Sequence, residues 1–193
     1  MDKFSKLKPK DIFKEDKNEK VLFQDNILKV IKFEDWSIIK ERDVVVCIPY
    51  LIETNQIILR HEYIPTYKYV DGQEYYIALV GGGIELGEDP DVAITRELEE
   101  EAGIVLREDY KFEKMKPLFM NKGICDKVHP YILPLTERDY HEIVPPTDGS
   151  KIESISKSVK VDAKYIDSLN VSDMITDYML IKMKEYIKSY TTV

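Results

Sequence analysis

The chain has 193 residues, of which 28 are basic and 36 are acidic, and its net charge is −8. This length suits one domain, which buries roughly 70% of its unfolded surface and needs no disulfide or metal in order to fold. The negative charge argues against wide binding to a phosphate backbone. The longest uncharged run, Tyr75–Ile84, is too short to cross a membrane, so no membrane partner is expected.

Composition also predicts the compartment. Residues 1–11 alternate in charge and lack an apolar core, so they do not resemble a secretory signal. Cys47 and Cys125 are the only cysteines, too few for a disulfide framework, and a reducing, cytoplasmic location is therefore predicted. Residues 1–18 are charge-rich and are interpreted as a loosely docked arm.

The first half of the chain predicts strands. Val21–Phe33 and Trp36–Lys40 indicate an N-terminal antiparallel strand pair. Val44–Ile52 is apolar nearly throughout, which is typical of a strand buried on both faces, and a polar turn joins it to Gln56–Arg60 as a hairpin. Tyr75–Val80 predicts another apolar strand, which the three following glycines are expected to end.

A helix is predicted next. Asp89 is a good N-cap, Pro90 suits the first helical turn, and Gly103 suits the position just after the last turn.

The second half predicts two strands, a loop, a strand and a helix. The strands are Lys116–Met120 and Val128–Leu135, and the polar stretch Thr136–Ser150 is expected to be a functional loop. Ser158–Val161 predicts a last strand, and Val171–Ile187 has the periodicity of a helix with one apolar face. These elements together favour a mixed α+β fold or an α/β/α sandwich.

The predicted helix carries an electrostatic conflict. Glu97 precedes Glu100 by three residues and Glu101 by four, spacings at which like charges destabilise a helix by about 0.2–0.5 kcal/mol per pair. Ile94 and Leu98 form a neighbouring apolar stripe, so the carboxylates cannot all point into open water. A solvated acidic face is one interpretation. A hard divalent cation such as Mg²⁺, which prefers oxygen ligands, is the other.

The spacing of these residues favours the metal. Gly82, Glu88 and the run Arg96–Ile104 follow the pattern G-x5-E-x7-R-E-U-x-E-E-x-G-U, in which U is a bulky apolar residue. This resembles the Nudix hydrolase signature at every defined position. The resemblance implies an α/β fold, a Nudix α/β/α sandwich with a mixed central sheet. It also implies Mg²⁺- or Mn²⁺-dependent hydrolysis of a nucleoside diphosphate linked to a further group X.

The resemblance assigns roles by position. Glu97, Glu100 and Glu101 are expected to bind the metal, together with the carbonyl group of Gly82. Arg96 is expected to orient a glutamate by an ion pair, which places Arg96 and Glu100 among the catalytic residues. Glu88 is expected to support the metal site, and Glu88 and Gly83 are expected to lie beside the substrate.

The rest of the chain most resembles the ADP-ribose/ADP-sugar pyrophosphatase branch. The resemblance implies an arm and dimerisation strands over residues 1–40, a hydrolase domain over residues 41–193, and a homodimer. Ile57–Arg60 is similar to the strand that precedes the substrate loop in this branch, and Val171–Thr176 is similar to a turn and helix start near its C-terminus.

Three departures leave the substrate open. Ala78–Gly82 stands where the branch has Glu-x-Pro-Ala-Gly, His61–Tyr63 replaces Gln-Tyr-Arg, and Met120 replaces a proline. ADP-ribose or a nucleotide sugar, yielding a nucleoside monophosphate and a sugar phosphate, is the first expectation. Dinucleotides such as NADH or dinucleoside polyphosphates, capped RNA, and a non-catalytic Nudix ligand sensor are the alternatives.

The signature lacks a further acid, which relatives place in a late loop. Glu153 is the best candidate by position, ahead of Glu137 and Glu142, against the alternative of a solvated acid. Trp36 is a candidate for stacking on a base, although such side chains more often serve burial. Arg60 is a candidate for clamping a phosphate, with a surface ion pair as the alternative.

Overall fold

The computed structural model describes residues 19–146 and 155–191. Its central sheet has eight strands, five of which follow the order β10-β11-β4-β5-β13. Strand β11 (Lys127–Leu135) runs parallel to β4 (Val44–Leu51) along the whole of β4, whereas β5 (Gln56–Tyr63) and β13 (Lys157–Asp162) pair antiparallel. The central sheet is therefore mixed, as expected.

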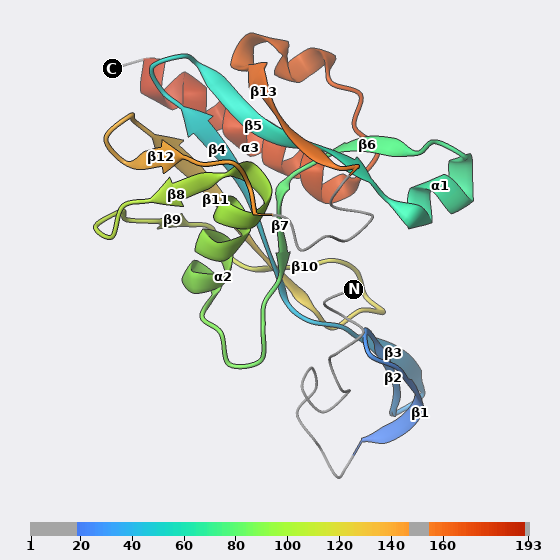
Figure 1. Cartoon of the computed structure of the whole chain (residues 1–193). Helices are drawn as coiled ribbons and strands as arrows, with labels where there is room; N and C mark the ends of the chain where they lie inside the picture. Colours follow the sequence, from blue (N-terminus) through green and yellow to red (C-terminus); the bar gives the residue numbers. More distant parts are fainter. Residues whose placement is uncertain (1–18, 147–154, 192–193) are drawn as a thin grey trace.

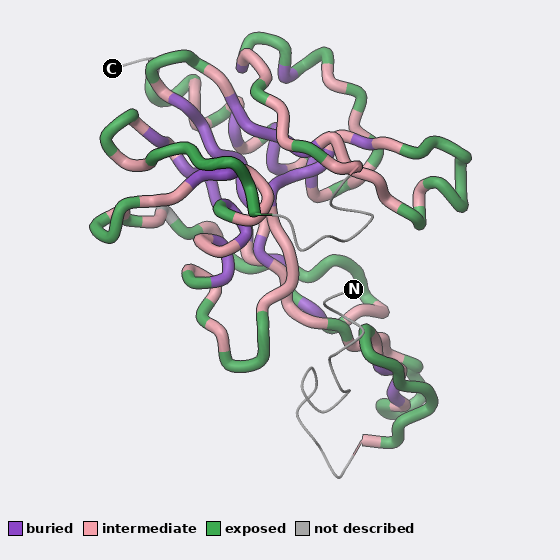
Figure 2. Tube along the Cα trace, viewed as in Figure 1, coloured by how far each residue is buried: buried purple, intermediate pink, exposed green. Residues whose placement is uncertain are grey.

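Helices cover both faces of this sheet (Figure 1). On one face lies α2 (Pro90–Glu97), which buries Ala93 and Ile94 in a core shared with β4 and β11. On the other face lies α3 (Met174–Thr191), whose Met179 and Met183 are fully buried in a second core. The buried residues concentrate between these layers (Figure 2). The predicted fold, an α/β/α sandwich with a mixed sheet, is confirmed.

One predicted strand is in fact two. Strand β6 (Tyr75–Ala78) pairs with β5. The chain then crosses to β4, with which β7 (Val80–Gly83) pairs antiparallel. This is possible because β4 and β5 pair with each other only at their hairpin end, so each keeps a free edge beyond it. The prediction that the three glycines end the strand was therefore wrong, because they form most of β7.

The helix after the glycines begins and stops where predicted. The side chain of Asp89 accepts a hydrogen bond from Asp91 N, Pro90 is the first helical residue, and Gly103 ends the helix with a φ of 65°. The last turn, η3 (Leu98–Ala102), is a π-helix, which was not predicted.

The C-terminal helix starts later than predicted, at Met174 instead of Val171. Asp173 sets this start, because its carboxylate accepts hydrogen bonds from the backbone N–H groups of Ile175 and Thr176. Two short helices, α1 (Pro65–Asp71) and η4 (Ala163–Ser168), were not predicted. Helix α1 contains no buried residue, so its sequence lacks the apolar periodicity on which such a prediction depends.

The region after the Nudix-like segment holds short strands. They are β8 (Ile104–Leu106), β9 (Glu113–Lys114), β10 (Leu118–Phe119) and β12 (Tyr140–Glu142). Strand β12 pairs with β8, so part of the expected functional loop is a strand. The end of that loop, residues 147–150, lies outside the described residues.

The N-terminal strands form a separate antiparallel sheet, β1 (Lys20–Gln24), β2 (Lys29–Phe33) and β3 (Trp36–Lys40). The sheet stands apart from the main body (Figure 1) and touches it through a bridge between Ile39 and Ile124. It exposes six large apolar side chains, which are Val21, Leu22, Phe23, Ile27, Phe33 and Trp36. In the part of the chain that the structure describes, no helix is long and apolar enough to span a membrane.

Candidate active site

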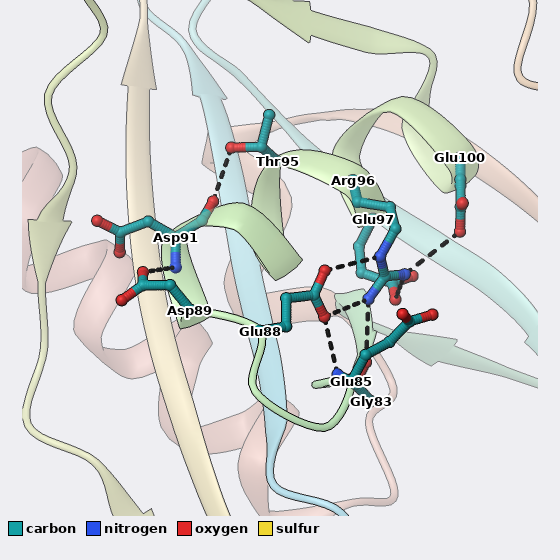
Figure 3. A network of polar contacts seen from close by, with 9 residues as sticks. All are labelled: Gly83, Glu85, Glu88, Asp89, Asp91, Thr95, Arg96, Glu97 and Glu100. Atoms are coloured by element: carbon teal, nitrogen blue, oxygen red, sulfur yellow. Dashed lines mark hydrogen bonds and ion pairs between the residues drawn. The ribbon is translucent and has the colours of Figure 1, made fainter. Parts of the chain in front are cut away.

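Arg96 holds the site together (Figure 3). Its Nε and Nη2 atoms donate to the two carboxylate oxygens of Glu88, each at 3.1 Å, and Nη2 also donates to Gly83 O at 3.0 Å. Its Nη1 atom contacts the carboxylate of Glu97 and lies 3.4 Å from Glu100 Oε2. One side chain of α2 therefore ties two signature glutamates to the loop that precedes the helix.

Glu97 lies directly against β7. A Cβ atom placed on Gly82 would be 2.5 Å from Glu97 Oε1, closer than any real contact permits. Glycine at position 82 thus lets the carboxylate reach the backbone of the strand. This contact brings the proposed carbonyl ligand, Gly82, beside the first proposed carboxylate ligand.

Glu101 is held in a different way. Its Oε2 atom accepts a hydrogen bond from Gly81 N at 2.9 Å, and its Oε1 atom is 3.5 Å from Arg60 Nη2. Its side chain is only 19% exposed. Burial raises the pKa of Glu101 to about 8, and the charges of Glu62 and Glu97 act in the same direction, although Arg60 and the Gly81 hydrogen bond oppose them.

Glu62 is a fourth acid near this group that the sequence analysis missed. Burial raises its pKa, Arg60 lowers it, and the charges of Asp173 and Glu97 raise it again. Glu62 lies two residues from Arg60 on β5, so both side chains are on the same face of the strand. The strand pattern of β5 could have indicated this acid.

The donor set fits a hard divalent cation. It consists of carboxylates and a backbone carbonyl, all of them oxygen ligands, and its crowded carboxylates repel one another until a cation neutralises them. As they stand, no three acidic, histidine or cysteine side chains of the described residues converge on one point as metal ligands would. Arg96 draws Glu97 and Glu100 to one side, while Arg60 and Gly81 hold Glu101 on the other.

Arg42 also borders the site, and the sequence analysis missed it. A Cβ atom on Gly83 would be 2.8 Å from Arg42 Cζ, so the guanidinium lies against the glycine. Arg42 comes from the link between β3 and β4, far from the signature in the sequence, and register alone brings it there because Val44 pairs with Gly83. The charge of Arg42 beside a glycine-rich strand suits an anionic ligand.

A pocket adjoins the solvent side of α2. Its volume is about 590 Å³, and its lining includes Arg96 and Glu100 as well as the apolar side chains of Val92 and Phe112. The pocket therefore extends from the edge of the signature residues over the outer surface of the helix.

Three further predicted site residues lie in different places. Arg60 is buried, with 5% exposure, and its Nη1 atom donates to Glu101 O at 2.9 Å. It therefore contacts the last turn of the signature helix from strand β5. Trp36 is 59% exposed on the N-terminal sheet, which a single chain does not bring to α2 (Figure 1). Glu153 lies outside the described residues.

A family model described as the NUDIX domain matches residues 41–168, more than half of the chain. The chain belongs to the Nudix family. The Nudix match includes every residue of the signature, from Gly82 to Ile104, and the strands β4, β5 and β11 that surround it. The Nudix domain implies pyrophosphohydrolase activity, and Nudix enzymes generally use divalent metal ions.

Comparison with solved structures agrees on the fold. A crystal structure of an ADP compounds hydrolase is similar with a TM-score of 0.61 and 17% sequence identity, over 94% of this chain and 100% of the other. At this identity the likeness concerns the Nudix fold alone. No curated protein matches the chain.

Proposed function

We propose that this Nudix hydrolase cleaves the pyrophosphate bond of ADP-ribose or of a nucleotide sugar, releasing a nucleoside monophosphate and a sugar phosphate. The observation that carries the proposal is the complete set of signature glutamates around α2 and its last turn, three of which, Glu88, Glu97 and Glu100, contact the single side chain of Arg96. The likeness to an ADP compounds hydrolase supports an adenine-containing substrate.

The residues divide the chemistry among them. A bound Mg²⁺ or Mn²⁺ would neutralise charge on the non-bridging oxygens of the pyrophosphate. Glu97, Glu100 and Glu101, with the carbonyl of Gly82, would hold the ion, and Glu153 would hold the attacking water and accept its proton. Arg96 orients the carboxylates through the contacts described above, and Glu88 fixes Arg96.

The surroundings suit a substrate with a charged centre and a less charged end. Arg42, beside Gly83, offers a cation to the pyrophosphate. The pocket over α2 includes the acidic side chain of Glu99, which would accept hydrogen bonds from sugar hydroxyls but would repel further phosphates. This combination favours a sugar as X over a polyphosphate or a capped RNA.

The N-terminal sheet supports a homodimer. Its six exposed apolar side chains form more uncovered apolar surface than a dangling extension needs. Among the strands of residues 19–146 and 155–191, β1 pairs only with β2, which leaves its other edge available to a second strand. In a dimer, Trp36 of one chain would be available to stack on the base bound by the other.

The test is a substrate screen with purified protein and Mg²⁺ or Mn²⁺. The candidates are ADP-ribose, ADP-glucose, UDP-glucose, NADH, diadenosine polyphosphates and capped RNA, and chromatography identifies the products. Release of AMP and a sugar phosphate supports the proposal. Preferred cleavage of a dinucleoside polyphosphate or of capped RNA would contradict the proposed substrate and assign the enzyme to that substrate class. Binding without any cleavage would indicate a ligand sensor.

A further inference from the structure

Two side chains from neighbouring strands converge on one backbone atom of the signature helix. Arg60 Nη1 donates to Glu101 O at 2.9 Å, and Ser158 Oγ donates to the same oxygen at 2.8 Å. Arg60 belongs to β5 and Ser158 to β13, and the two residues are register partners. Their side chains therefore leave the sheet on the same face and reach the same point.

The oxygen that they hold needs partners from outside the helix. The helix stops at Gly103, so the carbonyl group of Glu101 has no N–H group one turn further on to accept from. A hydrogen bond from either side chain would satisfy this carbonyl. Two donors, one of them a buried guanidinium, exceed that requirement, and they also define where residue 101 sits relative to β5.

The contacts of the buried Arg60 side chain are with Glu101. Arg60 is 5% exposed, and its hydrogen bond through Nη1 and its ion pair through Nη2 are both to Glu101. Its Nε atom is buried and has no hydrogen-bond partner among the described residues. Burial of a guanidinium without full pairing is costly, so an apolar residue would serve packing better at this position.

We propose that Arg60 and Ser158 are positioning residues that hold Glu101 in place for metal binding. This inference rests on the proposed function, because it takes Glu101 as a metal ligand. This role replaces the predicted one of Arg60 as a phosphate clamp, because its guanidinium is engaged with Glu101. Ser158 fixes the backbone of Glu101, and Arg60 fixes both the backbone and, through Nη2, the carboxylate. Partners of this kind typically change metal affinity by about ten- to a hundredfold when they are removed.

Ser158→Ala is the decisive variant, because it removes one hydroxyl group and leaves the guanidinium in place. Its affinity for Mn²⁺, measured from the electron paramagnetic resonance signal of the free ion, should fall about tenfold. With substrate, kcat should fall by a similar factor, while KM changes less than about twofold. Ser158→Thr keeps the hydroxyl and should restore both values.

Ser156→Ala is the matched control. Ser156 belongs to the same segment and also bonds to β5, accepting from Tyr63 N at 3.2 Å, but it does not contact the signature. It should keep the Mn²⁺ affinity of the unmodified protein. Arg60→Met should weaken Mn²⁺ binding more than Ser158→Ala does, provided that circular dichroism shows that the variant is folded. If it is unfolded, the two serine variants decide.

The outcomes are distinct. Unchanged Mn²⁺ affinity and kcat in Ser158→Ala would overturn the inference, and so would equal losses in Ser156→Ala. A lower melting temperature with unchanged Mn²⁺ affinity would show that the contact serves only stability. If the unmodified protein neither binds Mn²⁺ nor cleaves any nucleotide, then the proposed function fails and this inference fails with it.

Discussion

Arg96 forms a two-pronged ion pair with Glu88, eight residues earlier in the chain, in which each of two guanidinium nitrogens lies 3.1 Å from a different carboxylate oxygen. The pair closes the loop between β7 and α2. Glu88 Oε2 also accepts from Glu85 N at 2.8 Å, so the loop and the helix are fixed together. The geometry of the proposed metal ligands therefore depends on a residue that is not itself proposed to bind the metal.

Arg96→Lys tests this dependence. Lysine keeps the charge but cannot bond to both oxygens of Glu88 and to Glu97 at once, so we expect kcat to fall by at least about tenfold. The fold should persist, because Arg96 belongs to neither hydrophobic core. Steady-state kinetics and circular dichroism check both expectations. Arg107→Lys, at an exposed position beyond the signature, is the control and should change neither. Unchanged kcat in Arg96→Lys would contradict the role of the ion pair.

Glu101 predicts a specific dependence on pH. Its folded-state pKa of about 8 exceeds the ordinary value of 4.5, so the neutral form is favoured in the metal-free protein. The stability that this group contributes is present at low pH and is lost as the pH rises from 4.5 to about 8. Melting curves of the metal-free protein should show this loss relative to Glu101→Gln, which cannot titrate.

Metal binding should show the opposite trend, because the ion displaces the proton of Glu101. The affinity for Mn²⁺ should rise up to about tenfold per pH unit below pH 8 and then level off. In Glu101→Gln, the affinity for Mn²⁺ should no longer depend on pH in this way, and kcat should fall at least about a hundredfold. Glu108→Gln, at an exposed position beyond the signature, should keep both. A slope that persists in Glu101→Gln would assign the titrating proton to another group.

The N-terminal sheet predicts a dimer. Light scattering at micromolar protein concentration should give twice the chain mass, and Leu22→Asp with Phe23→Asp should give a monomer, because both side chains are about half exposed on β1. Val70→Asp changes an even more exposed apolar residue, at 76%, on α1 and should leave the dimer intact. A monomeric mass for the unmodified protein would refute the prediction.

Glu153 remains a prediction from the sequence. If it holds the attacking water, Glu153→Gln should lower kcat strongly and change KM little, since the lost interaction acts mainly in the transition state. Glu142→Gln is a suitable comparison, because Glu142 forms an exposed ion pair with Lys160 at 2.6 Å and should matter less. If Glu142→Gln lowers kcat strongly and Glu153→Gln does not, then Glu142 holds the attacking water.

The sequence predicted the parts of the molecule that local chemistry determines. Asp89, Pro90 and Gly103 mark the ends of the signature helix because capping depends on neighbouring residues only. The apolar run of β4 likewise predicted a buried strand. The acids of the signature were identified because their spacing matches the Nudix pattern at every defined position.

The rest depends on contacts between distant segments. The convergence of Arg60 and Ser158 on Glu101 results from strand register, which no local pattern encodes. The same holds for Arg42, which reaches Gly83 from a link before the first strand of the central sheet. The division of Tyr75–Gly83 into two strands follows from the separation of β4 and β5, and this separation is a property of the whole sheet.

The π-helical turn at Leu98–Ala102 has a consequence for anyone who transplants the signature into another scaffold. A wider turn advances through a smaller angle per residue, so Glu100 and Glu101 do not occupy the directions that a regular α-helix would give them. A graft that copies the signature residues onto an ideal helix would give these two carboxylates different directions relative to Glu97. A graft therefore needs the pattern together with its irregular turn. It also needs strands β5 and β13, whose side chains donate hydrogen bonds to the carbonyl group of Glu101 near the end of that turn.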